Sequence, residues 1–112
     1  MKLSKAFTVK GEINRVFDSI QAFMPSMKFR LENANRPILL VFKRGSKLGS
    51  LVSFEVEGCE TILTISLQQN GDEVNILCSY DVLGIGQVFT SSDRSTLESE
   101  IERLQYFLKT SI

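Results

Sequence analysis

The stretch RSTLESEIERLQYFLK, residues 94–109, has the residue spacing of an amphipathic helix. Its apolar residues recur three and four positions apart: Leu97, Ile101, Leu104 and Leu108. This spacing places them on one face of a helix, with the acidic residues Glu98, Glu100 and Glu102 expected on the other side. Residues 91–93, Ser-Ser-Asp, are typical of a helix start, and Ser95 with Glu98 has the spacing of a capping box. A helix with one apolar stripe must cover a second layer, so the segment predicts a layered fold.

A second, shorter helix is expected near the N-terminus, at residues 12–24. Pro25 ends it, because the residue before a proline avoids the helical region of backbone space. The apolar residues of this segment also fall at helical spacing: Ile13, Val16, Phe17, Ile20, and Phe23 or Met24.

Most of the remaining chain alternates apolar and polar residues, as strands with one solvated face do. Asn70-Gly71 is the strongest hairpin signal, and it predicts a type I′ turn. Residues 82–89 contain Gly84-Ile85-Gly86 and are expected to form a loop or a bulged edge strand. Strands are expected at residues 3–9, 27–32, 38–43, 51–57, 61–68 and 73–80.

The order of these elements predicts a fold of the α+β class, with residues 1–112 forming one domain. Short connections favour antiparallel neighbours. We therefore expect a two-layer sandwich in the order β-α-β(4-6)-α. In it, a curved antiparallel sheet of about five to seven strands packs against a short N-terminal helix and a long C-terminal helix.

This order, with Val16-Phe17-Asp18 in the early helix and the closing leucine-rich helix, resembles small helix-grip domains of the START-like, or SRPBCC-type, superfamily. It is also similar to the TBP-like fold. The helix-grip resemblance implies an apolar or lipid-like small molecule held between the sheet and the last helix. The side chains that would line such a site are expected to be Phe54, Ile85, Leu104, Phe107 and Leu108.

Charge is unevenly distributed along the chain. Residues 1–47 carry ten Lys and Arg against three acidic residues, and residues 48–112 carry three against ten. The two halves either neutralise one another in the fold or leave a basic surface for an anionic partner. Within the glycine-containing segment 43–50, expected to be a flexible hairpin loop, the candidate anion contacts are Lys43, Arg44 and Lys47.

Several kinds of chemistry are disfavoured by composition. The chain has no histidine and two cysteines, Cys59 and Cys78, so no metal site or cofactor is expected and both thiols are expected to be reduced. Lone carboxylates such as Glu60 and Asp81 make a poor case for catalysis, and we expect no enzyme. No apolar run is long enough for a membrane helix and no secretory signal is visible, so a cytoplasmic location is expected.

Three functions follow from these expectations. The first is a non-catalytic binding module for an apolar or lipid-like molecule. The second is a protein-interaction or homodimerisation domain that uses a face or an edge of the sheet. The third is nucleic-acid binding through the basic N-terminal half; no nucleic-acid partner is expected if the two halves neutralise one another.

Overall fold

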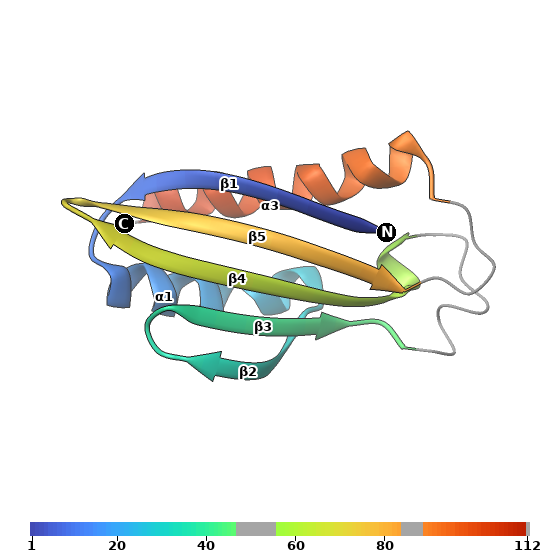
Figure 1. Cartoon of the computed structure of the whole chain (residues 1–112), viewed down its shortest axis with the longest axis horizontal. Helices are drawn as coiled ribbons and strands as arrows, with labels where there is room; N and C mark the ends of the chain where they lie inside the picture. The colour runs from blue at the N-terminus through green and yellow to red at the C-terminus, as the bar shows by residue number, and fades with distance from the viewer. Residues whose placement is uncertain (47–55, 84–88, 112) are drawn as a thin grey trace.

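The computed structural model describes residues 1–46, 56–83 and 89–111. They form one antiparallel sheet whose strands lie in the order β1-β5-β4-β3-β2 (Figure 1). The strands are β1 (Lys2–Lys10), β2 (Arg30–Asn35), β3 (Leu39–Arg44), β4 (Glu60–Asn70) and β5 (Glu73–Leu83). The helices are α1 (Ile13–Phe23), α3 (Ser91–Ser111) and the short 3-10 turns η1 (Met24–Met27) and η2 (Val56–Gly58).

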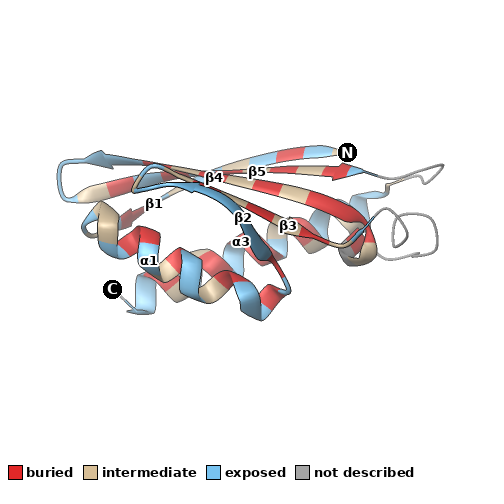
Figure 2. Ribbon diagram, turned by 90° about the horizontal axis from the view of Figure 1, so that it is seen from below, coloured by how far each residue is buried: buried red, intermediate tan, exposed pale blue. Residues whose placement is uncertain are grey.

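Helices α1 and α3 lie on the same side of the sheet (Figure 2). No described helix covers the opposite side, which is called the outer face below. The expected α+β class, the two-layer arrangement and the antiparallel sheet are confirmed. None of the described helices is long and apolar enough to cross a lipid bilayer.

The core lies between the sheet and the two helices. Alternate residues of β3, β4 and β5 point into it, because successive side chains of a strand face opposite sides. The whole leucine-rich stripe of α3 is buried against them. The largest fully buried side chains include Ile20, Met24, Leu40, Phe42, Leu63, Ile65, Ile76, Leu97, Ile101, Leu104 and Leu108.

Helix α1 lies within one residue of the expected span 12–24, but Pro25 does not end it for the expected reason: Met24, the residue before the proline, has helical backbone angles (φ −59°, ψ −33°), and the chain continues into η1. The Glu12 carboxylate caps the helix by accepting the backbone N–H of Arg15 at 3.0 Å. Pro25 lies in η1, and Lys28 then turns the chain with a left-handed φ of 67°. The strand expected at residues 27–32 is therefore shifted toward the C-terminus, because Met27 belongs to η1 and β2 begins only at Arg30.

The β4–β5 hairpin is confirmed, but its turn is not the one expected. Asn70 pairs with Glu73, so Gly71 and Asp72 are the two central residues. Gly71 has a φ of +63° and Asp72 has no positive φ. A glycine with positive φ at the first central position alone is the pattern of a type II′ turn, not of type I′.

Three further expectations are corrected. Val56, expected in a strand, lies in η2, while residues 51–55 of that strand lie outside the described residues. β5 runs on through Leu83, because β4 continues to Glu60 and supplies a partner for it. The capping box of α3 consists of Thr90 and Asp93: the Thr90 backbone N–H donates to Asp93 Oδ2 at 2.7 Å, and the Asp93 N–H donates to Thr90 Oγ1 at 3.3 Å.

Candidate functional site

The centre of the outer face carries no charged side chain on β1, β5, β4 or β3. The strand register aligns its outward-pointing residues in three consecutive rows. The middle row combines apolar and small residues, and Leu77 in it is 44% exposed. Read from β1 toward β3, the uncharged rows are Thr8, Asn75 and Gln68; Ala6, Leu77, Ser66 and Leu39; and Ser4, Ser79, Thr64 and Val41.

Charged rows bound this uncharged region at both ends of the strands. Beyond the first row, Lys10 of β1 lies opposite Glu73 of β5 in the strand register. At the other end of the strands, Lys2 lies opposite Asp81, and Lys43 of β3 belongs to the same row. Charge is thus excluded from the centre of the face and kept at its margins, although 23% of all residues are charged.

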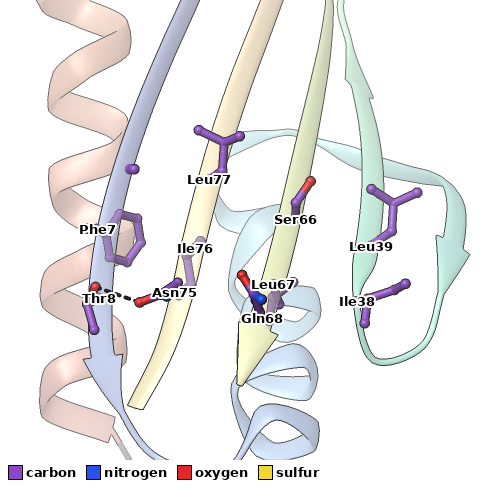
Figure 3. A pocket seen from close by; sticks show the side chains of 11 residues that line it. Phe7, Thr8, Ile38, Leu39, Ser66, Leu67, Gln68, Asn75, Ile76 and Leu77 are labelled. Atoms are coloured by element: carbon purple, nitrogen blue, oxygen red, sulfur yellow. Dashed lines mark hydrogen bonds between the residues drawn. The ribbon is translucent and has the colours of Figure 1, made fainter. Parts of the chain in front are cut away.

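The outer face also contains a shallow depression of about 670 Å³ that is open to solvent. Figure 3 shows its lining side chains coming from four neighbouring strands. Lining side chains of neighbouring strands contact one another: Thr8 Oγ1 donates a hydrogen bond to Asn75 Oδ1 at 3.1 Å. Ile38, 50% exposed, lines its margin beside Leu39. Exposed apolar side chains grouped on one face are typical of an interaction surface.

A buried polar cluster connects the sheet to α3 on the inner side. Arg44, the last residue of β3, forms a two-pronged ion pair with Glu100 of α3, with Nη1–Oε2 and Nη2–Oε1 distances of 2.6 and 3.1 Å. The Tyr80 hydroxyl donates to Glu100 Oε1 at 3.0 Å. Arg44 also donates to the Met27 carbonyl at 3.2 Å and lies 4.2 Å from the centre of the Phe29 ring. Arg44 and Glu100 are 4% and 2% exposed.

The candidate anion contacts are therefore separated by the fold. Arg44 is not a loop residue, because it continues the inward-facing alternation of β3, and its guanidinium already binds an internal carboxylate. Lys43 points to the outer face and pairs with Glu60 at 3.2 Å. Lys47 lies outside the described residues.

The candidate ligand-lining residues are likewise divided. Leu104 and Leu108 are buried in the core, while Phe107 lies at its margin and stacks on Phe23. Phe54 and Ile85 lie outside the described residues. Binding of a molecule between the sheet and α3 stays a prediction.

The oppositely charged halves of the chain interleave. Ion pairs between them join Lys5 to Glu102 and Lys43 to Glu60, in addition to the buried pair of Arg44. These contacts neutralise part of the N-terminal basic charge. Within the described residues, no group of three or more potential ligands is placed to hold a metal ion.

No disulfide joins Cys59 and Cys78, and both are buried. Burial raises the pKa of the Cys78 thiol to about 12 from its usual 9.0. Burial and the neighbouring Glu100 carboxylate also raise the pKa of Tyr80. The protein should therefore lose stability in alkali, because both groups ionise more readily in the unfolded chain.

The buried Cys78 thiol lowers the stability of the fold as the pH rises. Between pH 9 and 12 the unfolded chain has released this proton and the folded chain has kept it, so unfolding becomes more favourable as the pH rises. Its contribution is a loss of about 1.4 kcal/mol per pH unit. Urea denaturation at several pH values in this range measures the free energy of unfolding. This free energy should fall less steeply with pH in Cys78→Ala, which retains Tyr80, than in the native protein. Parallel profiles for the two proteins would contradict the prediction.

The fold and its surfaces define a small two-layer α+β domain. No protein family and no curated protein matches the sequence. Among solved structures it is similar to the solution structure of the Aha1 dimer from Colwellia psychrerythraea, with a TM-score of 0.66, 7% identity, and coverage of 97% of this chain and 96% of that chain. At this identity the likeness is one of fold, and it supports a small α+β domain without deciding between the helix-grip and TBP-like families.

Proposed function

We propose that this chain is a protein-interaction domain that forms a homodimer through the outer face of its sheet. The observation that carries the proposal is the block of three uncharged rows bounded by charged rows. The buried centre of a protein interface is depleted of charge and its rim is polar, which is the same distribution. The similarity to a structure described as a dimer supports a second copy as the partner.

The size of the uncharged block fits the centre of such an interface. Two of the uncharged rows extend over four strands and one over three. With rows two residues apart, the block covers at most roughly 20 Å by 19 Å, from the rise and spacing of strands. This is about half of the roughly 800 Å² that each partner buries in a standard interface. The charged rows would supply the rim.

The edges of the sheet are less suitable than its face. β1 carries Lys2, Lys5 and Lys10, and lysines on an edge strand oppose pairing with another strand. β2, at the other edge, has a register shift between Leu31 and Asn33 that interrupts its ladder. Nucleic-acid binding is also disfavoured, because basic side chains of the N-terminal half pair with acidic side chains of the fold.

Two substitutions on the same strand test the proposal. Leu77 lies in the middle uncharged row, whereas Leu83 lies beyond the charged row at the end of β5, and they are 44% and 42% exposed. Sedimentation equilibrium should show a concentration-dependent dimer. Leu77→Lys should raise its Kd by at least about tenfold, equivalent to about 1.4 kcal/mol, and Leu83→Lys should leave it unchanged.

Circular dichroism establishes that both variants remain folded. A native protein that stays monomeric up to high micromolar concentration would overturn the proposal. So would equal weakening of the dimer by Leu77→Lys and Leu83→Lys, because the contact would then not be centred on the uncharged rows.

A further inference from the structure

A second depression lies on the helical side of the molecule, between the end of α1 and the last turns of α3. It is a shallow depression of about 470 Å³ that is open to solvent. It lies on the opposite side of the sheet from the outer face, at the margin of the core, because Phe23 and Phe107 pack against the core. We call it the helix groove; its lining residues are Phe23, Ser99, Glu102, Arg103, Tyr106, Phe107 and Thr110.

Aromatic rings form much of the helix groove. Phe23 and Phe107 stack with their ring centres 4.6 Å apart and their planes 26° apart, and both are only partly buried. Tyr106 is 72% exposed, although it belongs to a residue type that usually buries much of its ring. Stacked rings offer a flat apolar surface, and an exposed tyrosine beside them can close over a planar group.

Two charged side chains line the groove, and they differ in their partners. Glu102 points to β1 and pairs with Lys5 at 3.5 Å. Arg103 is exposed and makes no ion pair with any other described residue. A guanidinium can bind a carboxylate or sulfonate through two parallel hydrogen bonds. The groove therefore combines aromatic surface with one available cation.

We propose that the helix groove binds a small planar aromatic anion, with its rings against Phe23, Tyr106 and Phe107 and its acidic group on Arg103. The aromatic surface and the single guanidinium match a molecule of two or three rings that carries one acidic group. The proposal is independent of the homodimer, because the groove and the outer face lie on opposite sides of the sheet.

Two fluorescent probes of similar ring structure test it: anilinonaphthalene sulfonate, which is anionic, and phenylnaphthylamine, which is neutral. The native protein should bind the sulfonate saturably at one site, and more tightly than the amine. Arg103→Gln should raise the Kd of the sulfonate by about fivefold to tenfold and leave that of the amine unchanged. Tyr106→Ala should weaken the binding of both probes.

The matched control is Arg94→Gln, which removes an exposed arginine from the first turn of the same helix, away from the groove. It should not change the affinity for either probe, and neither should Leu77→Lys on the outer face. Absence of saturable binding would overturn the proposal. Equal effects of Arg103→Gln on both probes, or probe binding that Tyr106→Ala leaves intact, would overturn it too.

Discussion

Glu100→Gln should lower the free energy of unfolding by about 3–5 kcal/mol, which is the usual result of removing one partner of a buried ion pair. The side chains of Arg44 and Glu100 are only 5% and 3% exposed. Glutamine has nearly the same shape as glutamate and can still accept the hydrogen bond of Tyr80. The variant would nevertheless leave the Arg44 guanidinium buried without a counter-charge, and water cannot replace the carboxylate there.

The same helix provides a matched control two residues further on. Glu102 forms an ion pair with Lys5, but its side chain is 66% exposed. An exposed pair contributes little, because water and salt screen it, so Glu102→Gln should cost at most about 1 kcal/mol. Urea denaturation of the two variants compares the same chemical change in buried and solvated surroundings.

A double variant separates the ion pair from other contacts of Arg44. Arg44→Met alone should be strongly destabilising, since it leaves the Glu100 carboxylate buried beside Tyr80. Combining it with Glu100→Gln removes both charges, and the double variant should be more stable than the sum of the two single effects implies. If the losses in free energy of unfolding of the two single variants simply add in the double variant, the interaction between Arg44 and Glu100 does not contribute to stability, and the prediction is wrong.

This ion pair shows why the fold was easier to predict from the sequence than its interior chemistry. Helices and hairpins leave local signals, such as the three-and-four spacing of the α3 stripe or the glycine at the β4–β5 turn. Arg44 and Glu100 are 56 positions apart. The strand alternation around Arg44 and the helical spacing around Glu100 do not predict that β3 and α3 will come into contact at these two residues.

A signal for each partner was nevertheless present. Arg44 has the same parity as Leu40 and Phe42, so the strand alternation directs it inward. Glu100 lies three positions after Leu97 and four before Leu104, which places it within the apolar stripe of α3 and not on the acidic side where it was expected. A basic residue at an inward strand position and an acidic residue within a helix stripe are together typical of a buried pair.

The outer face and the helix groove could be predicted from the sequence only in part. The uncharged rows appear once the register is known, because they join residues of four strands that are distant in sequence. Phe107 is visibly outside the α3 stripe, but its partner Phe23 comes from α1. The spacing within one helix does not specify which helix will lie beside it.

Leu104→Ala should lower the free energy of unfolding by about 2–5 kcal/mol. Leu104 is 1% exposed and lies in the middle of the stripe that covers the sheet. Truncation removes apolar contacts and leaves a cavity that the packed strands can fill only by shifting. Alanine favours helices, so the loss would come from packing and not from the helix itself.

The neighbouring residue is the control for that result. Arg103 is exposed on the same helical turn, and Arg103→Ala should change the free energy of unfolding by no more than about 0.5 kcal/mol. Chemical denaturation of both variants, followed by circular dichroism, measures the difference. An equal denaturation midpoint for Leu104→Ala and Arg103→Ala would contradict the packing of α3 on the sheet. It would mean that Leu104, like Arg103, faces solvent, where truncation of the side chain leaves no cavity.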